Sequence, residues 1–477
     1  MWSGEAMSRS EACGRAYSSG PFLGTDGGSG PAGDAHEELK ENRWNGTERE
    51  YPENGNAEKP GFFDRFFGGD RVLWVIIAIL SVASLLVIFS STASMAYRKA
   101  GGDTSHYFFA QLKFIVLGFA AMIAVHRLNY QRYARPRLLA LVFVAALLFM
   151  LLTFFIGVNL NSASRWIRIP VIGVTFQPSD FLRIALIAIL AQQLAKRQRF
   201  IHRIPLLPAL TVRGWRKNPR KNLDILTQTT LPVLGPIAIA CGAIFMSNFS
   251  TAAITFCTCC IMLYMGRVRV RELWRLVALV VVALVLAVSF MYVFDIGRSH
   301  TWVNRLGIGS LLGETEQVAE QSDDDNLQQE QARIAIASGG LLGKGPGNST
   351  QRSNLPHSYS DFAYAFIVEE YGFVGAMGIL FLYLCIFFRG IVTFRRCGTA
   401  FPSLLVLGLC LMITFQAICN MLVSVCIFPV TGQTLPLISL GGSSIVFTCV
   451  ALGLILGISR QVKEQSLDRP RGETMLD

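Results

Sequence analysis

Two opposite charges, Asp180 and Arg183, stand three residues apart at the start of a long apolar run. That spacing puts both side chains on one face of a helix, and Gln177 and Ser179, on either side of a proline, are typical of a helix start. Ionisable groups in apolar segments are costly and usually face a cavity or each other. The pair therefore indicates either a site for a charged ligand or a structural ion pair, and the residues alone leave both interpretations open.

A second candidate site is the segment 428–444, which lies between two apolar runs near the end of the chain. Its prolines, glycines and hydroxyl residues cannot continue a helix through lipid. Irregular backbone at that depth survives only when it is buried in protein or lines a wet cavity. We expect this segment to mark a binding site, with contacts from Pro429, Gly432, Pro436, Ser439, Gly441, Gly442, Ser443 and Ser444.

Arg165 and Trp166 form a third candidate, in the polar stretch before the Asp180 segment. An arginine can bind a pyrophosphate through two parallel N–H groups. A tryptophan suits the interface between a membrane and water. The pair predicts either a phosphate contact or an interfacial anchor without a ligand.

The composition places these candidates in a membrane protein. Of the 477 residues, 52% are hydrophobic and 16% are charged, and the mean hydropathy is +0.43. The net charge of +11 is explained by the basic residues that orient membrane proteins rather than by nucleic-acid binding. The eleven cysteines show no zinc-ligand spacing and are interpreted as packing residues.

Ten apolar runs have about the length that a bilayer requires. Basic residues concentrate in the connections on one side of this arrangement, which by the positive-inside rule is the cytoplasm and places both chain ends there. The predicted fold class is all-α, a polytopic integral membrane protein of about ten transmembrane helices with a large extracytoplasmic loop. The predicted spans are 72–94, 107–126, 138–157, 176–195, 229–246, 251–265, 273–294, 371–392, 402–425 and 440–458.

The spans divide the chain into a membrane domain, 71–460, and two tails. Residues 1–70 are expected to be a disordered cytoplasmic tail, because their polar composition cannot bury enough apolar surface. Residues 461–477 are expected to be a cytoplasmic C-terminal tail. Within the domain, 295–370 is a long outer loop, acidic in its middle and then glycine-rich. A structureless loop of that length is usually functional or disordered.

Several of these segments resemble motifs of the SEDS family (shape, elongation, division and sporulation proteins, which include FtsW, RodA and SpoVE). The segment 177–183 is similar to a family motif that has Glu and Lys at the charged positions, and 165–166 to an Arg-Trp pair before it. The segments 328–349, 361–372 and 428–444 resemble three further motifs. The resemblance covers roughly 72–460 and is strongest to the cell-division branch, FtsW.

The resemblance implies the SEDS fold and an inverting peptidoglycan glycosyltransferase. Such an enzyme polymerises lipid II into β-1,4 glycan strands during septal wall synthesis in bacterial cell division. It also implies an essential aspartate seven residues before Gln328, where this chain has Gln321. The nearest aspartates are Asp323, Asp324 and Asp325, and one of them is expected to be the catalytic base. For each of the three, a solvated acidic run is the alternative. The other residues assigned to substrate are Gln328, Gln331 and Ser349, together with Arg165, Trp166, Gln177, Ser179, Asp180 and Arg183.

The implied partners are lipid II, membrane lipids, a class B penicillin-binding protein transpeptidase and other divisome proteins, with no nucleic acid. The implied location is the bacterial cytoplasmic (inner) membrane at the division septum. The resemblance assigns no cofactor and no metal site, and a requirement for a divalent cation (Mg2+ or Mn2+) stays open. A flippase for the same lipid-linked precursor, an elongation-type (RodA-like) polymerase and an inactive division scaffold also stay open.

Overall fold

The computed structural model describes residues 68–91, 105–156, 158–160, 163–169, 174–198, 201, 205–207, 218–294, 316–351, 362–429 and 431–467. At some of these positions only the backbone is described, among them 158–160, 163–169 and 316–326. Nearly all of the expected N-terminal tail and residues 468–477 of the expected C-terminal tail lie outside the described residues.

Each of the ten predicted spans coincides with a helix. The last helix continues past the predicted span, so it includes the first residues of the stretch assigned to the C-terminal tail. The helices are α3 (Arg71–Ser91), α5 (Ser105–Arg127), α7 (Pro136–Ile156), α8 (Pro178–Arg197), α11 (Leu231–Ser247), α12 (Phe249–Met265), α13 (Val270–Val293), α17 (Ala363–Arg396), α18 (Ala400–Ser424) and α19 (Ser443–Leu467).

By length and composition, the described part of the chain contains eight helices that could cross a membrane. The two predicted spans outside this set are α8, which carries Asp180 and Arg183 among its apolar residues, and α12, which has 17 residues. The polytopic helical class is therefore confirmed, while the count of ten crossings stays a prediction.

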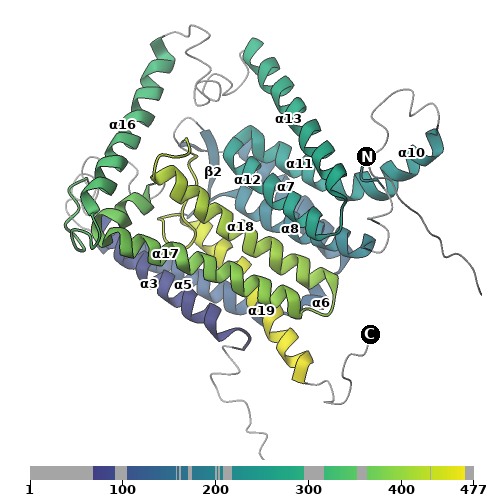
Figure 1. The fold of residues 1–477 in the computed structure, drawn as a ribbon, viewed down its shortest axis with the longest axis horizontal. Helices are drawn as coiled ribbons and strands as arrows, with labels where there is room; N and C mark the ends of the chain where they lie inside the picture. The colour runs from purple at the N-terminus through teal and green to yellow at the C-terminus, as the bar shows by residue number, and fades with distance from the viewer. Residues whose placement is uncertain are drawn as a thin grey trace, which may run out of the picture. The chain divides into compact units, whose positions relative to one another are not determined.

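The helices nearest the C-terminus form the centre of the bundle. Figure 1 shows α3, α5, α19, α18 and α17 lying side by side, and successive pairs among them are in contact. In the apolar stretch of α18, 78% of residues are buried, and in that of α19, 67%, compared with 6% in α13. Because α13 is apolar yet packs on little else that is described, its surface is suited to lipid. The core is thus built around α18 and α19, which flank the predicted binding segment.

Three short antiparallel strands, which were not predicted, precede α8. They are β1 (Val158–Leu160), β2 (Ala163–Ile169) and β3 (Val174–Phe176), in the order β1-β2-β3. Trp166 pairs with Val158, and Phe176 with Ile167. The sheet places the predicted Arg165–Trp166 pair on its middle strand and leads directly into the start of α8.

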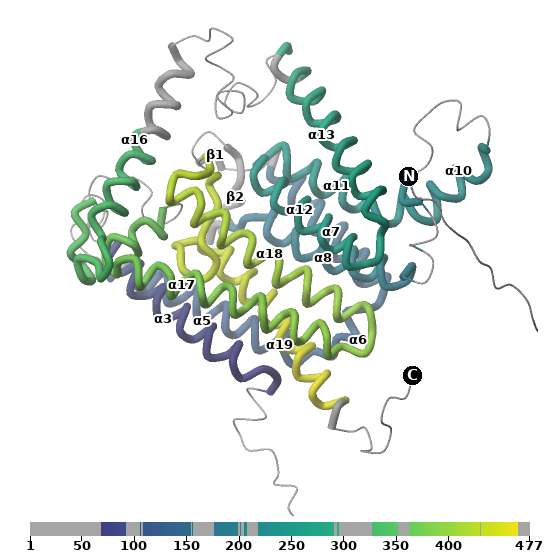
Figure 2. The backbone as a smooth tube through the Cα atoms, in the orientation of Figure 1, coloured from purple at the N-terminus to yellow at the C-terminus, as the bar shows by residue number. Residues whose placement is uncertain are grey.

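Part of the expected outer loop, 295–370, has regular structure, since residues Glu316–Gly339 form a helix, α16. This stretch is rich in Glu, Gln and Ala, which favour helix, and it has no glycine or proline before its last residue. Its second half packs against α17 and α18 through a small apolar cluster of Ala332, Phe362, Ala365 and Val423. Figure 2 shows the second half of α16 beside the start of α17, and the two helices are in contact.

Short helical pieces occupy two of the connections. They are α6 (Tyr130–Tyr133), α10 (Pro219–Ile225) and the π-helical turn η1 (Leu226–Thr230), which runs into α11. Pro232, at the start of α11, has no N–H to continue the α-helical ladder. This is a physical reason for the wider π turn immediately before it.

Candidate functional site

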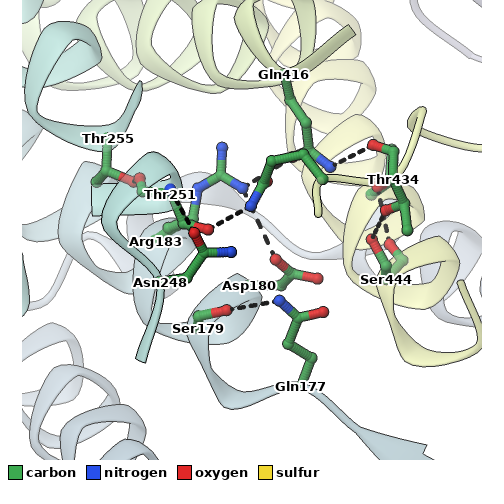
Figure 3. A network of polar contacts seen from close by, with 12 residues as sticks. Gln177, Ser179, Asp180, Arg183, Asn248, Thr251, Thr255, Gln416, Thr434 and Ser444 are labelled. Atoms are coloured by element: carbon green, nitrogen blue, oxygen red, sulfur yellow. Dashed lines mark hydrogen bonds and ion pairs between the residues drawn. The ribbon is translucent and has the colours of Figure 1, made fainter. Parts of the chain in front are cut away.

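The Asp180–Arg183 pair lies at the N-terminus of α8, buried within the bundle. Pro178 occupies the first turn, where its missing N–H costs nothing, so the helix begins there. Asp180 is 8% exposed and Arg183 is 1% exposed. Arg183 Nη1 lies 3.7 Å from Asp180 Oδ1 and donates a 2.8 Å hydrogen bond to Gln416 Oε1 on α18 (Figure 3).

The Arg183 guanidinium is only partly satisfied. Among the residues that the structure describes, its Nε and Nη2 atoms are buried without a hydrogen-bond partner. Buried N–H groups of a charged side chain rarely stay unpaired, so each such case needs an explanation such as a ligand or water. Donors on a fixed cation are suited to the oxygen of an anionic group. Arg183 is therefore the strongest candidate for a ligand contact in this region.

The predicted binding segment is irregular, as expected, over residues 431–442, here called the polar segment. Amide side chains from neighbouring helices hold its backbone. Gln416 Nε2 donates to Thr434 O at 3.0 Å, and Asn420 Nδ2 donates to Gln433 O at 2.7 Å. Gln416 thus links Arg183 to the polar segment. The two amides also provide donors for backbone carbonyls that would have no hydrogen-bond partner in lipid.

Helix α12 contributes a second set of contacts to the polar segment (Figure 3). Asn248 is the N-cap of α12 and accepts hydrogen bonds from the backbone N–H groups of Ser250 and Thr251. Its amide also donates to Thr431 O at 3.5 Å, and the Gln433 amide donates to the Thr251 hydroxyl. Asn248 therefore caps α12 and also holds the first residue of the polar segment.

The far half of the polar segment is a fixed turn. Leu437 has a positive φ of 66°, a conformation that costs a non-glycine residue about 1–3 kcal/mol. The turn persists because its neighbours hold it. The Ser439 hydroxyl accepts a 2.9 Å bond from Leu435 N, and the Tyr383 hydroxyl donates to Pro436 O. Ser84 on α3 donates to Ile438 O at 3.0 Å.

The polar segment meets the start of α8 at the N-terminus of α19. Gln177 N donates to the Ser443 hydroxyl oxygen at 3.0 Å, and the Gln177 amide donates to Ser179 Oγ at 3.0 Å. The Ser444 hydroxyl is a hydrogen-bond partner of Asp180 and lies 3.4 Å from the Thr434 hydroxyl. The structure thus joins two predicted motifs, 177–183 and 439–444, into one polar cluster.

Some predicted residues within 428–444 do not join this cluster through side chains. Pro429 is exposed, whereas Pro436 contributes its carbonyl to the bond from Tyr383. Gly432 and Gly442 have positive φ values of 63° and 51°, so they are required by the shape of the turn. Gly441 has room for only a tightly packed Cβ, 3.2 Å from that of Ser444.

The predicted residues of α16 form a separate group. Gln331 is half-buried, and Gln328 lies on the same helix; the neighbouring Gln329 carbonyl accepts a 3.3 Å bond from Cys426 Sγ, just before the polar segment. Ser349 donates its hydroxyl to Glu369. The backbones of Asp323, Asp324 and Asp325 lie in α16, and those of Arg165 and Trp166 lie in β2. The side chains of these five residues lie outside the described part of the structure.

Sequence reasoning missed several residues that build the site. Among them are Gln416, Asn420 and Gln433, which are 6%, 1% and 4% exposed. Their signal was present in the sequence, since two of them are amides inside the apolar run 402–425. Such amides in a membrane span need partners, and this need could have predicted that they face the irregular segment.

The Gln416 bridge leads to a prediction about stability. We expect Gln416→Leu to lower the free energy of unfolding by about 2 kcal/mol or more, because it leaves Arg183 Nη1 and Thr434 O buried without their shared partner. Thermal unfolding of the detergent-purified protein measures this change. Gln465→Leu, at an exposed position of α19, is the matched control and should unfold as the unsubstituted chain does. Equal unfolding temperatures for the two variants would contradict the bridge.

The fold and site together define a polytopic membrane protein with a broken helix near its C-terminus that meets a buried ion pair. The chain belongs to the FtsW/RodA/SpoVE family of cell cycle proteins, whose family model matches residues 70–464. The predicted resemblance is thereby confirmed.

Relatives in this family carry informative names. The probable peptidoglycan glycosyltransferase FtsW of Bacillus subtilis (strain 168) is 28% identical over 396 residues, which cover 83% of this chain and 91% of that protein. Stage V sporulation protein E of the same organism is 28% identical over 398 residues, covering 82% of this chain and 97% of that protein.

Solved structures show the same fold. A chain from a peptidoglycan synthase complex is 22% identical, covers 83% of this chain and 98% of its own, and superposes with a TM-score of 0.59. The rod shape determining protein RodA of Thermus thermophilus gives a TM-score of 0.52 at 22% identity, covering 83% of this chain and 98% of its own. These likenesses confirm the SEDS fold.

Proposed function

We propose that the protein is an inverting peptidoglycan glycosyltransferase that polymerises lipid II into β-1,4 glycan strands during septal cell-wall synthesis. The observation that carries the proposal is the family match over 70–464, whose relatives include proteins named peptidoglycan glycosyltransferase FtsW. The partly unpaired guanidinium of Arg183 beside the polar segment supports it, because the substrate has an anionic pyrophosphate.

The proposed reaction is a single displacement. A sugar hydroxyl of the acceptor attacks the anomeric carbon of the donor, and the bond from that carbon to the lipid pyrophosphate breaks. The hydroxyl proton passes to a carboxylate acting as general base. We assign the base to one of Asp323, Asp324 and Asp325. One displacement inverts an α-linked donor into a β-1,4 product.

Cations stabilise the leaving pyrophosphate as its charge grows. We assign this role to Arg183 and to Arg165, which β2 carries toward the start of α8. Asp180 keeps Arg183 oriented. The other proposed contacts with the disaccharide-pyrophosphate are the remaining predicted residues, namely Trp166, Gln177, Ser179, Gln328, Gln331, Ser349, Pro429, Gly432, Pro436, Ser439, Gly441, Gly442, Ser443 and Ser444.

The proposal includes a location and partners. The protein would reside in the bacterial inner membrane at the division septum, with both termini in the cytoplasm. A class B penicillin-binding protein would cross-link the strands that it makes, with other divisome proteins in the same assembly. A structural neighbour comes from a peptidoglycan synthase complex, which supports such a partnership. No cofactor is proposed. The assay below measures whether polymerisation depends on Mg2+ or Mn2+.

The flippase, the elongation-type polymerase and the inactive scaffold are each distinguishable from this function. The names of the relatives favour the division and sporulation branches over the elongation branch. The polar motifs lie at the start of α8 and the start of α19, where β3 and the polar segment precede them. This clustering at one end of two helices differs from the midplane sites typical of transporters.

The proposed function is tested with purified protein. Incubation with lipid II, with and without a class B penicillin-binding protein and a divalent cation, should yield glycan chains that a gel resolves by length. Transbilayer movement of a fluorescent lipid II analogue in vesicles tests the flippase alternative. Movement without chain formation in every condition would reject the glycosyltransferase.

A further inference from the structure

Two adjacent glutamates, Glu369 and Glu370, are buried in the first turns of α17, outside the polar cluster around Arg183. They are 0% and 1% exposed. Burying a carboxylate is expensive unless several donors bind it. Two neighbouring buried carboxylates therefore indicate an assembled anchor whose donors come from elsewhere in the chain.

The donors to Glu369 come from the segment that follows α16, residues 339–351, here called the glycine-rich turn. Lys344 Nζ lies 2.7 Å from Glu369 Oε1, and the Thr350 N–H and hydroxyl both donate to the same oxygen at 2.9 Å. The Ser349 hydroxyl donates to Oε2. One carboxylate thus holds the middle and the C-terminal end of the glycine-rich turn against α17.

Glu370 connects a third element. The Ser90 hydroxyl at the end of α3 donates to Glu370 Oε1, and the Gly347 N–H donates to the same oxygen at 2.9 Å. The Gly347 N–H also lies 3.1 Å from Ser90 Oγ. Helices α3 and α17 and the glycine-rich turn therefore meet at this carboxylate.

The backbones of the glycine-rich turn and α17 pack so closely that three glycines have no space for a side chain. A Cβ on Gly339 would lie 2.1 Å from Val368 O, and one on Gly343 would lie 2.2 Å from Glu370 O. Gly372 interrupts α17 with a φ of 69°, and its own Cβ would lie 2.4 Å from Gly343 N. Backbone hydrogen bonds also connect the glycine-rich turn to α17. In one of them, Lys344 N donates to Glu369 O at 3.0 Å.

The acidic end of α16 lies far from this anchor, so a small change of angle there would be amplified along the helix. Asp323 lies sixteen residues before Gly339 on this helix, which corresponds to about 24 Å at the helical rise of about 1.5 Å per residue. A tilt of about 10° at the anchor would therefore move the acidic residues by roughly 4 Å. A general base works only within about 2.6–3.2 Å of the proton that it takes. A small loosening at Glu369 is thus enough to remove the base from its position.

We propose that Glu369 and Glu370 are positioning residues, which lock the glycine-rich turn onto α17 and so fix the orientation of α16 and its aspartates. The inference rests on the proposed function, since it concerns the catalytic role assigned to Asp323, Asp324 and Asp325. Neither glutamate needs to touch the substrate.

The test compares Glu369→Gln and Lys344→Met with Lys344→Arg and with the control Glu464→Gln, whose side chain is 60% exposed on α19. Steady-state polymerisation of lipid II gives kcat and KM for each purified protein. Hydrogen exchange followed by mass spectrometry measures the exchange rate of the backbone amides in each segment of the same proteins.

We expect Glu369→Gln and Lys344→Met to lower kcat on the order of 10- to 100-fold with little change in KM. Exchange should become faster in 327–351 and stay unchanged in α18 and α19. Lys344→Arg, which keeps the cation, should retain most activity.

Three results would overturn the proposal. Activity lost with unchanged exchange in 327–351 would mean that Glu369 acts directly on substrate. Faster exchange throughout α18 and α19 would mean a general loss of folding. Wild-type behaviour of Glu369→Gln in both measurements would mean that no anchor exists. If the unsubstituted protein makes no glycan, the proposed function fails, and the exchange data still decide whether the glutamates hold α16.

Discussion

Replacing Asp323, Asp324 and Asp325 together by Asn is expected to reduce glycan polymerisation on the order of 100-fold or more. The substitution preserves side-chain size and removes every aspartate from the stretch of α16 where the resemblance implies the catalytic base. Since Asn and Asp have similar helix propensities, membrane insertion and folding should persist. The measurement is the rate of chain formation from lipid II by equal amounts of purified protein.

The three single variants then identify the base. One of them should account for most of the loss, while the other two stay near the unsubstituted rate. A triple variant that polymerises normally would show that the base lies elsewhere. Glu314, Glu316 and Glu320, the next carboxylates toward the N-terminus, would then be the candidates.

Arg183→Ala should have the second large effect, a loss of polymerisation of about 100-fold or more, because the leaving pyrophosphate would lack a preorganised cation. Arg183→Lys should retain part of the activity, since it keeps the charge and loses the planar fork. The truncation also leaves Asp180 buried without its partner, which is expected to cost roughly 3–5 kcal/mol of stability.

A double variant separates these two effects. Asp180→Asn combined with Arg183→Met removes both charges and fills the space, so thermal unfolding should return toward that of the unsubstituted protein while polymerisation stays low. Full activity of Arg183→Ala, or recovery of activity in the double variant, would reject a catalytic role for this arginine and leave a structural ion pair.

The sequence by itself determined the helical framework. A run of about twenty apolar residues has one main solution in lipid, because only a helix satisfies every backbone group within the segment. The ten predicted spans consequently coincide with helices even where α8 is too polar, and α12 too short, to meet a general criterion. The irregular segment 431–442 was predictable for the converse reason, since its prolines and glycines exclude a continuous helix.

Local patterns were less informative outside the bundle. The strands β1–β3 are short and pair with one another within a stretch that reads as a polar loop. Helix α16 lacks an apolar stripe of the usual kind, so its acidic sequence was interpreted as part of a loop, although only a few small residues such as Ala332 and Ala335 are needed to dock it. Docking against α17 and α18, rather than amphipathic periodicity, stabilises it there.

Only the tertiary structure decided which polar residues share a site. Gln177 meets Ser443 across 266 positions of the chain, and Arg183 meets Gln416 across 233. Glu369 and Glu370 became an anchor only when α3, α17 and the glycine-rich turn converged on them. Helical periodicity sets the face on which a residue lies, but the partner opposite that face depends on how helices pack. A buried polar group must be satisfied by whatever group packing brings to it, and these partnerships appear only in the folded protein.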